Sequence, residues 1–168
     1  MIYQVLVNQF PKMLKNLINI LDMSNEFADS KKIDFDVLLN SRLAPDQFAL
    51  IRQIQIACDT AKLAASRLSG KEAPKHDDNE KNLNEIKNRI NEVISYLKNF
   101  KDSDFKNAEM AKISQPRWEG KYLNGDEFFI EHVLPNFYFH ITTAYSILRH
   151  NGINIGKKNY LGDMPFKQ

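Results

Sequence analysis

The sequence has little of what several classes of protein require. A single cysteine, Cys58, excludes a disulfide within the chain. Six glycines and six prolines are few for a turn-rich β fold, and their scarcity favours helices. No apolar run approaches the roughly 20 residues that a membrane-spanning helix needs. Because the N-terminal segment also lacks the charged start and cleavage site of a signal peptide, we expect a cytoplasmic protein outside the membrane.

An excess of charge of one sign is also absent. The 23 Lys and Arg residues nearly balance 21 Asp and Glu residues, which leaves a formal net charge of +2. The lysines are scattered among acidic residues, whereas a nucleic-acid groove requires a clustered basic stripe. We therefore expect no nucleic-acid partner. A length of 168 residues with 43% hydrophobic residues fits a single domain, residues 1–168, with a substantial core.

Apolar residues recur at spacings of three and four in four segments, which is typical of amphipathic helices. The predicted helices run from about Tyr3 to Phe27, from after Pro45 to near Gly70, from about Asn79 to Phe100, and from Asn124 to about His150. Asn124 with Glu127 three residues later predicts a cap at the start of the last helix. Residues 108–123 break the pattern and predict a short hairpin or flap. The sequence thus predicts an all-α, up-and-down four-helix bundle with a hairpin or flap before the last helix.

The last predicted helix carries a polar stripe. His132, Asn136 and His140 are four residues apart, so they share one helix face. Helical metal sites use this spacing, but a rise of 1.5 Å per residue separates the two histidines by roughly 12 Å. A divalent metal would therefore bind Asn136 with one histidine, and an amide oxygen is a poor zinc ligand. The alternative is a seam in which each histidine is hydrogen-bonded to a neighbour.

Polar residues also follow one another along the second predicted helix. Asp59 is a candidate to orient a histidine of the last helix or to provide an oxygen ligand. Arg52 and Gln55 are candidate ligand-binding residues at the same helical spacing. The alternative is an exposed network among these three side chains. Which of the two holds depends on how the helix is rotated.

A proline interrupts the last predicted helix close to the polar stripe. Pro135 removes the hydrogen bond that the Glu131 carbonyl would accept. Either the helix kinks there and frees a carbonyl near a pocket, or it begins at Pro135 and residues 126–134 form a separate turn.

Several stretches together resemble an uncharacterised bacterial family within the DinB/YfiT-like superfamily. They are LLNSRLAPDQFALIRQIQIACDTAKLAASRLSG at residues 38–70, LPNFYFHITTAYSILRHNG and INIGKKNYLG within residues 134–162, and LKNLINILD in the first helix. The resemblance implies a four-helix bundle, often dimeric. Many members bind a divalent metal, and some are thiol-dependent S-transferases or isomerases.

The metal site that this resemblance implies has three histidines, one on the second helix and two in an HxxxH on the last. Here the second helix, Asp46 to Leu68, contains no histidine, and Asn136 stands in both four-residue pairs of the last helix. The sequence therefore predicts a small-molecule pocket between the second and fourth helices, with an incomplete metal site. A divalent metal such as zinc or nickel is disfavoured by the missing histidine.

Two alternatives to this function stay open. The first is a metal-dependent thiol transferase or hydrolase in which His140 is the base or ligand and Asp59 orients it. His132, Asn136, Arg52 and Gln55 would then contact the ligand. The second is a non-catalytic module that binds a small molecule or forms a homodimer. The sequence does not decide whether the protein is an enzyme.

Overall fold

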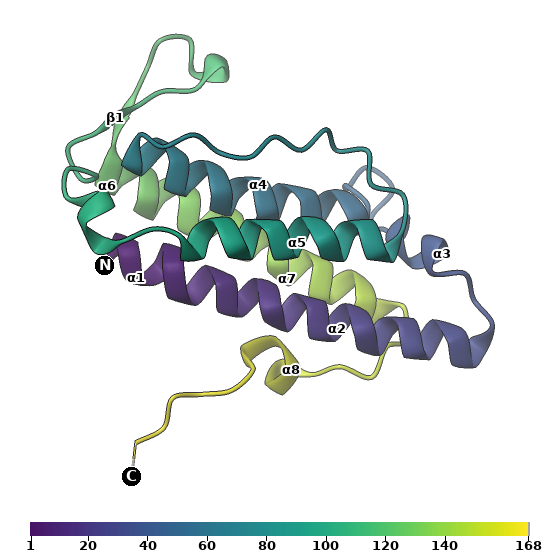
Figure 1. Ribbon diagram of the computed structural model, residues 1–168. Coiled ribbons are helices and arrows are strands. Elements are labelled where there is room, and N and C mark those ends of the chain that lie inside the picture. The colour runs from purple at the N-terminus through teal and green to yellow at the C-terminus, as the bar shows by residue number, and fades with distance from the viewer. Residues whose placement is uncertain (168) are drawn as a thin grey trace.

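The computed structural model describes residues 1–167, which form a bundle of four long helices (Figure 1). The long helices are α2 (Phe10–Lys31), α4 (Leu50–Ser69), α5 (Leu83–Lys98) and α7 (Leu134–His150). The short helices are α1 (Ile2–Gln4), α3 (Phe35–Leu39), α6 (Gly125–Glu127) and α8 (Lys157–Leu161). The predicted all-α bundle is confirmed, although α4 begins at Leu50 rather than directly after Pro45.

The direction of the helices differs from the expected up-and-down order. α4 and α5 run the same way along the bundle, and residues 70–82 return over its whole length between them (Figure 1). A helix of the size of α4 is about 30 Å long. The extended segment 70–82 can span about 40 Å, which is enough to return along the whole helix. Nothing in the apolar periodicity of a helix records its direction relative to a neighbour.

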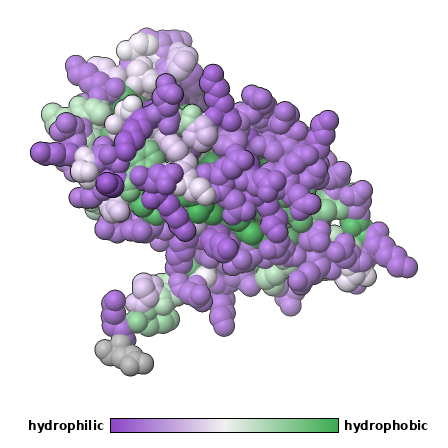
Figure 2. All heavy atoms as spheres, viewed as in Figure 1, coloured by the Kyte–Doolittle hydropathy of each residue, from purple (hydrophilic) through white to green (hydrophobic). Residues whose placement is uncertain are grey.

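Small and aromatic side chains fill the centre of the bundle. Ala57, Ala61 and Ala65 of α4 are fully buried, which allows neighbouring helices to approach closely. Phe10 of α2 stacks on Phe137 of α7 with 3.8 Å between ring centres. The face shown in Figure 2 is mostly hydrophilic, with hydrophobic residues visible as small separate patches. No helix within residues 1–167 is both long and apolar enough to cross a membrane.

Each of the two parallel helices α2 and α7 has proline as its second residue and follows a π-helical segment. The segments are Val5–Gln9 and Phe128–Val133. In each, a backbone N–H bonds to the carbonyl five residues back: Phe10 to Val5, and Leu134 to Phe129. The wider turn accommodates the proline ring without breaking the helix. The alternative in which residues 126–134 form a separate turn is therefore wrong, because α6, the π segment and α7 form one continuous helix.

A small flap precedes this continuous helix, as predicted. Strand β1 (Lys112–Ile113) pairs antiparallel with β2 (Leu123–Asn124), and a 3₁₀ turn, Pro116–Trp118, lies between them. A second 3₁₀ turn, Asp102–Phe105, leads from α5 towards the flap. The Glu127 carboxylate accepts a 2.9 Å hydrogen bond from the Asn124 N–H, which caps the helix as its sequence predicted.

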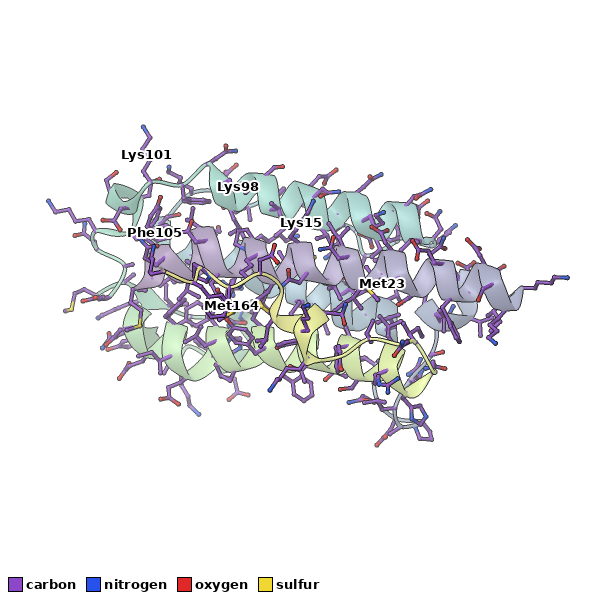
Figure 3. All side chains as sticks on the ribbon, turned by 90° about the horizontal axis from the view of Figure 1, so that it is seen from below. Lys15, Met23, Lys98, Lys101, Phe105 and Met164 are labelled. Carbon is purple, nitrogen blue, oxygen red and sulfur yellow. The ribbon has the colours of Figure 1, made fainter. Side chains whose placement is uncertain are left out.

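The C-terminal segment packs on the outside of the bundle. Seen from below in Figure 3, α8 lies in front of α2. The side-chain amide of Asn16 donates to the Tyr160 carbonyl at 2.9 Å, and the Tyr160 hydroxyl lies 3.0 Å from the Thr142 hydroxyl. These bonds join α8 to both α2 and α7.

Gly125 is the position where the flap region and the start of the last helix approach most closely. A Cβ atom there would lie 1.7 Å from the Ala108 carbonyl oxygen, which is backbone and cannot rotate away. We therefore expect Gly125→Ala to lower the free energy of unfolding by at least about 1–3 kcal/mol. A Cβ at Gly156 meets nothing within 4 Å, so Gly156→Ala should change it by less than about 0.5 kcal/mol. Urea unfolding of both variants checks this, and equal losses would contradict it.

Candidate functional site

His140 is held between α7 and α4 by a buried amide. Its Nδ1 lies 2.7 Å from Oε1 of Gln53, and Nε2 of Gln53 donates to the Phe48 carbonyl at 2.9 Å. Because the amide nitrogen is used on a carbonyl, the amide oxygen must accept, and the imidazole must donate from Nδ1. The proton of His140 is therefore on Nδ1, and in the neutral ring Nε2 carries the free lone pair.

The surroundings of His140 keep it neutral over a wide pH range. The side chain is only 7% exposed. Burial, together with repulsion from the positive charge of Arg52, lowers the pKa of His140 to about 4. At neutral pH the group is thus a hydrogen-bond acceptor at Nε2 and a very weak base.

Asn136 forms the next contact with α4, one helical turn before His140. Its Nδ2 donates to the Thr60 hydroxyl at 2.7 Å, and that hydroxyl donates to the Ile56 carbonyl at 2.7 Å. Within the described chain, no hydrogen bond reaches the Asn136 amide oxygen. We call Gln53, Thr60, Asn136 and His140 the α4–α7 seam. Its two cross-helix bonds agree with the hydrogen-bonded alternative that the sequence left open.

His132 lies at the flap end of α7's continuous helix, and it is neutral with the same tautomer as His140. Nη2 of Arg117, in the flap, lies 2.8 Å from His132 Nε2. Since a guanidinium only donates, Nε2 accepts and the proton is on Nδ1. Burial, then the charges of Arg117 and Arg67, lower the pKa of His132. The three residues of the predicted stripe therefore all face α4 or the flap, but they do not converge on one point.

Arg52, Gln55 and Asp59 lie on the other side of α4, towards α5. Asp59 accepts from Arg89 at 2.7 Å and from Lys62 at 2.9 Å. Within residues 1–167 Asp59 forms no hydrogen bond or ion pair with His140. The structure thus does not bring Asp59 to the histidine, and Gln53 occupies the orienting position instead.

A buried guanidinium organises the residues on this side of α4. Arg89 of α5 is only 2% exposed. It donates to Asp59 at 2.7 Å, to Asp78 at 2.6 Å and to Glu80 at 2.8 Å. Burial opposes its charge, but these hydrogen bonds and charges outweigh burial and raise the pKa of Arg89 above its usual value.

The remaining two predicted residues join the same group of charges. Gln55 accepts from Arg52 at 3.2 Å and donates to Glu80 at 2.9 Å, while Arg52 pairs with Asp78. We call Arg52, Gln55, Asp59, Asp78, Glu80 and Arg89 the Arg89 cluster. The predicted exposed network among Arg52, Gln55 and Asp59 is found only in part, because Asp59 bonds to Arg89 and Lys62 instead, Gln55 is buried, and Arg52 is half-exposed.

Cys58 adjoins this cluster and is inert. It is fully buried, and burial raises the pKa of its thiol to about 12, with Arg89 opposing that effect. It is a core residue rather than a nucleophile.

The donor atoms of the seam do not fit the metal that the family resemblance implies. Around His140 they are one imidazole, two amides and a hydroxyl, whereas zinc and nickel sites use imidazole, thiolate and carboxylate. Within residues 1–167, no three His, Cys, Asp or Glu side chains lie together in a way that could hold a metal ion. No chemical step is therefore derived through a metal.

Two seam residues were missed by the sequence analysis, although one of them gives a signal. Gln53 lies among the apolar inner residues of α4, between Leu50 and Ala57, where a polar side chain needs a partner. Thr60 gives no such signal, because threonine is common on exposed helix faces. The sequence analysis also missed Arg89, because its neighbours on that helix face are polar and indicate a solvent-exposed surface.

Comparisons with known proteins place the chain in a family. The sequence matches the family described as "Domain of unknown function (DUF1993)" over residues 2–161. The chain therefore belongs to the DUF1993 family. No protein with a curated description matches it.

One solved structure is described as a DinB family member protein from Shewanella denitrificans. It has a TM-score of 0.97 and 62% sequence identity to this chain, and the match covers 100% of this chain and 96% of that one. The DinB-like fold that the sequence predicted is thus confirmed.

The depressed pKa of His140 predicts a pH-dependent stability. An unfolded histidine has a pKa near 6.5 and His140 in the folded protein about 4, so protons bind the unfolded chain more strongly between these values. Its contribution is present above about pH 6.5 and is lost as the pH falls through about 4. Between neutral pH and about pH 4, the free energy of unfolding of the wild type should fall by roughly 3 kcal/mol more than that of the His140→Gln variant falls. The free energies of unfolding are measured by urea titration at a series of pH values. An equal decrease with falling pH in the two proteins would contradict the prediction.

The Arg89 cluster predicts a large loss of stability when its cation is removed. Arg89→Met leaves the carboxylates of Asp59, Asp78 and Glu80 without their shared partner, which should cost about 3–5 kcal/mol. The control is Lys87→Met, which removes the ion pair between Lys87 of the same helix and Asp22 of α2. It should lower the free energy of unfolding by less than about 1 kcal/mol. Denaturant unfolding measures both, and similar losses would show that the cluster is not the stronger interaction.

Proposed function

We propose that this protein binds a small organic molecule at the α4–α7 seam, through a hydrogen bond to the neutral His140 and without a resident metal. The observation that carries the proposal is the 2.7 Å bond between His140 Nδ1 and Gln53 Oε1. This bond fixes the ring and leaves the Nε2 lone pair for a donor such as a hydroxyl or an amine. Within residues 1–167, no group of three His, Cys, Asp or Glu side chains at the seam could share a metal.

The chemistry of His140 favours binding over catalysis. A general base works best when its pKa lies near the working pH. With a pKa of about 4, His140 accepts a proton poorly at neutral pH, and roughly one molecule in a thousand carries the charge there. The same property makes it a dependable acceptor, because it does not change its charge near neutral pH.

The Phe139 side chain adjoins the seam and would pack on the apolar part of a ligand, whereas the Phe48 side chain lines the surface beside Arg52 and Gln55. Phe139 and Phe48 are each 56% exposed. The Phe139 ring lies 5.1 Å from the His140 ring, and the Phe48 carbonyl holds Gln53. A ligand with one donor and an apolar body matches these surroundings, since apolar pockets with a few placed polar groups are the usual form of small-molecule sites.

The same two phenylalanines support a second function, association of two copies of the chain. Large aromatics on an exposed face are enriched at interfaces between proteins. If Phe48 and Phe139 form a homodimer interface, Phe139→Ser would convert the dimer to a monomer in light scattering. A monomeric wild type would remove this second function and leave the first intact.

The binding proposal is tested by a thermal-shift screen of small hydroxy and amino compounds on untagged protein. We expect compounds that raise the melting temperature of the wild type and have no effect on His140→Ala. His150→Ala is the matched control, because His150 is exposed at the end of α7, and it should keep the full shift. Hits that stabilise His140→Ala equally would overturn the proposal.

Metal content of the same preparations tests the second half of the proposal. We expect substoichiometric zinc and nickel in the wild type and no change in His140→Ala. Near-stoichiometric metal in the wild type that disappears in His140→Ala would contradict a metal-free site and return the metalloenzyme alternative.

A further inference from the structure

A cleft lies at the end of the bundle where α4 begins. It has a volume of about 490 Å³ and lies between three segments: α3 with the turn that follows it, the first turns of α4, and the end of the return segment 70–82. These parts meet at the end of the bundle opposite the flap (Figure 1). Neither His140 nor Asn136 lines this cleft, which we call the α4 cleft, so it is separate from the acceptor atoms of the seam.

The inner wall of the α4 cleft is part of the Arg89 cluster. Gln55, only 4% exposed, accepts a hydrogen bond from Arg52 and donates one to Glu80. Asp78 and Glu80 accept from the buried Arg89 at 2.6 Å and 2.8 Å, and Asp78 also pairs with Arg52. Both carboxylates of the cleft are therefore fixed in place and neutralised by cations that belong to the protein itself.

The charges of the α4 cleft that remain without an ion pair are both positive. The charged residues of its lining are Arg42, Arg52, Lys81, Asp78 and Glu80. Three are positive and two are negative, which leaves a net charge of +1 in the lining. In the part of the chain that the structure describes, neither Arg42 nor Lys81 pairs with a carboxylate, and the Arg42 guanidinium bonds only to the Gln47 carbonyl at 2.7 Å. Because both side chains are exposed, they are available to an anion in the cleft.

An organic phosphate fits this combination of charges and apolar surface. A phosphate monoester carries between one and two negative charges at neutral pH, which the two cations without a carboxylate partner can balance. Arginine binds phosphate oxygens through two parallel N–H groups, and lysine binds them as a point charge. Phe48 lines the same cleft and is 56% exposed, so its ring offers an apolar surface to the organic part of the ligand.

We propose that the α4 cleft binds a small organic phosphate, with the phosphate on Arg42 and Lys81 and the organic group against Phe48. This site is independent of the function proposed for His140. Arg52 and Gln55, which the sequence indicated as ligand-binding residues, form the inner wall of the cleft and hold its two carboxylates away from the anion.

Calorimetric titration of the full chain with phenyl phosphate tests the proposal. We expect saturable binding of phenyl phosphate and none of benzyl alcohol at the same concentration. Arg42→Gln and Lys81→Gln should each weaken binding about tenfold or more, as expected for losing a charged hydrogen bond. Circular dichroism verifies that both variants fold. If Arg42→Gln does not, the exposed Lys81→Gln carries the test.

The contact with the organic group is tested by Phe48→Ser. This variant should weaken the binding of phenyl phosphate several-fold and leave the binding of inorganic phosphate unchanged, because inorganic phosphate has no apolar part for the ring to contact. Full affinity of Phe48→Ser for phenyl phosphate would overturn the assignment of the organic group to this wall.

Three variants outside the α4 cleft serve as controls. Arg117→Gln and Lys98→Gln each remove one positive charge from an exposed position that does not line the cleft, so both should bind phenyl phosphate like the wild type. His140→Ala should also bind it normally, which keeps this site distinct from the seam. Absent or non-saturable binding, tighter binding of benzoate than of phenyl phosphate, or equal affinities in the cleft variants and the control variants would each overturn the proposal.

Discussion

The buried guanidinium of Arg89 is the interaction on which the position of α4 depends. It joins three segments, because Asp59 comes from α4, Arg89 from α5, and Asp78 and Glu80 from the long return between them. Parallel neighbours in a bundle cannot be joined by a short loop, so the return must be fixed to the bundle along its path. Each carboxylate that Arg89 binds removes part of the cost of burying the cation, and together they fix one rotation of α4.

That rotation decides what α4 presents to α7. With Gln55 and Asp59 turned towards α5, Gln53 and Thr60 face the opposite helix, where they meet His140 and Asn136. The two polar faces of α4 are therefore linked. One is ionic and serves packing, and the other is neutral and leaves acceptor atoms without partners. The charged residues of the second helix are the more obvious candidates in the sequence, but they form ion pairs within the Arg89 cluster. The uncharged Gln53 is the residue that holds His140.

The sequence predicts the helices, the flap and the cap at Asn124 well, because these follow from local periodicity and local hydrogen bonds. It does not predict that α4 and α5 are parallel, or which polar face of α4 meets α7, since both depend on contacts between distant residues. Asp59 and Gln53 are only six positions apart, yet they point about 120° apart around the helix axis, so the rotation of the helix decides which of them meets α7. The π segment before Pro135 could not be predicted either, because a proline within a helical pattern indicates a disruption of the helix without indicating its form.

The tautomer of His140 explains how a metal-type arrangement persists without the ligands of a metal site. In metal sites a histidine commonly donates its second N–H to an oxygen acceptor, which aims the other nitrogen at the ion. Gln53 holds His140 in this way, yet one turn earlier Asn136 gives its amide nitrogen to Thr60 and has only a carbonyl oxygen free. The carbonyl oxygen of Asn136 and the lone pair of His140, one helical turn apart, are two hydrogen-bond acceptors. Two such acceptors select a neutral or cationic donor group in a ligand.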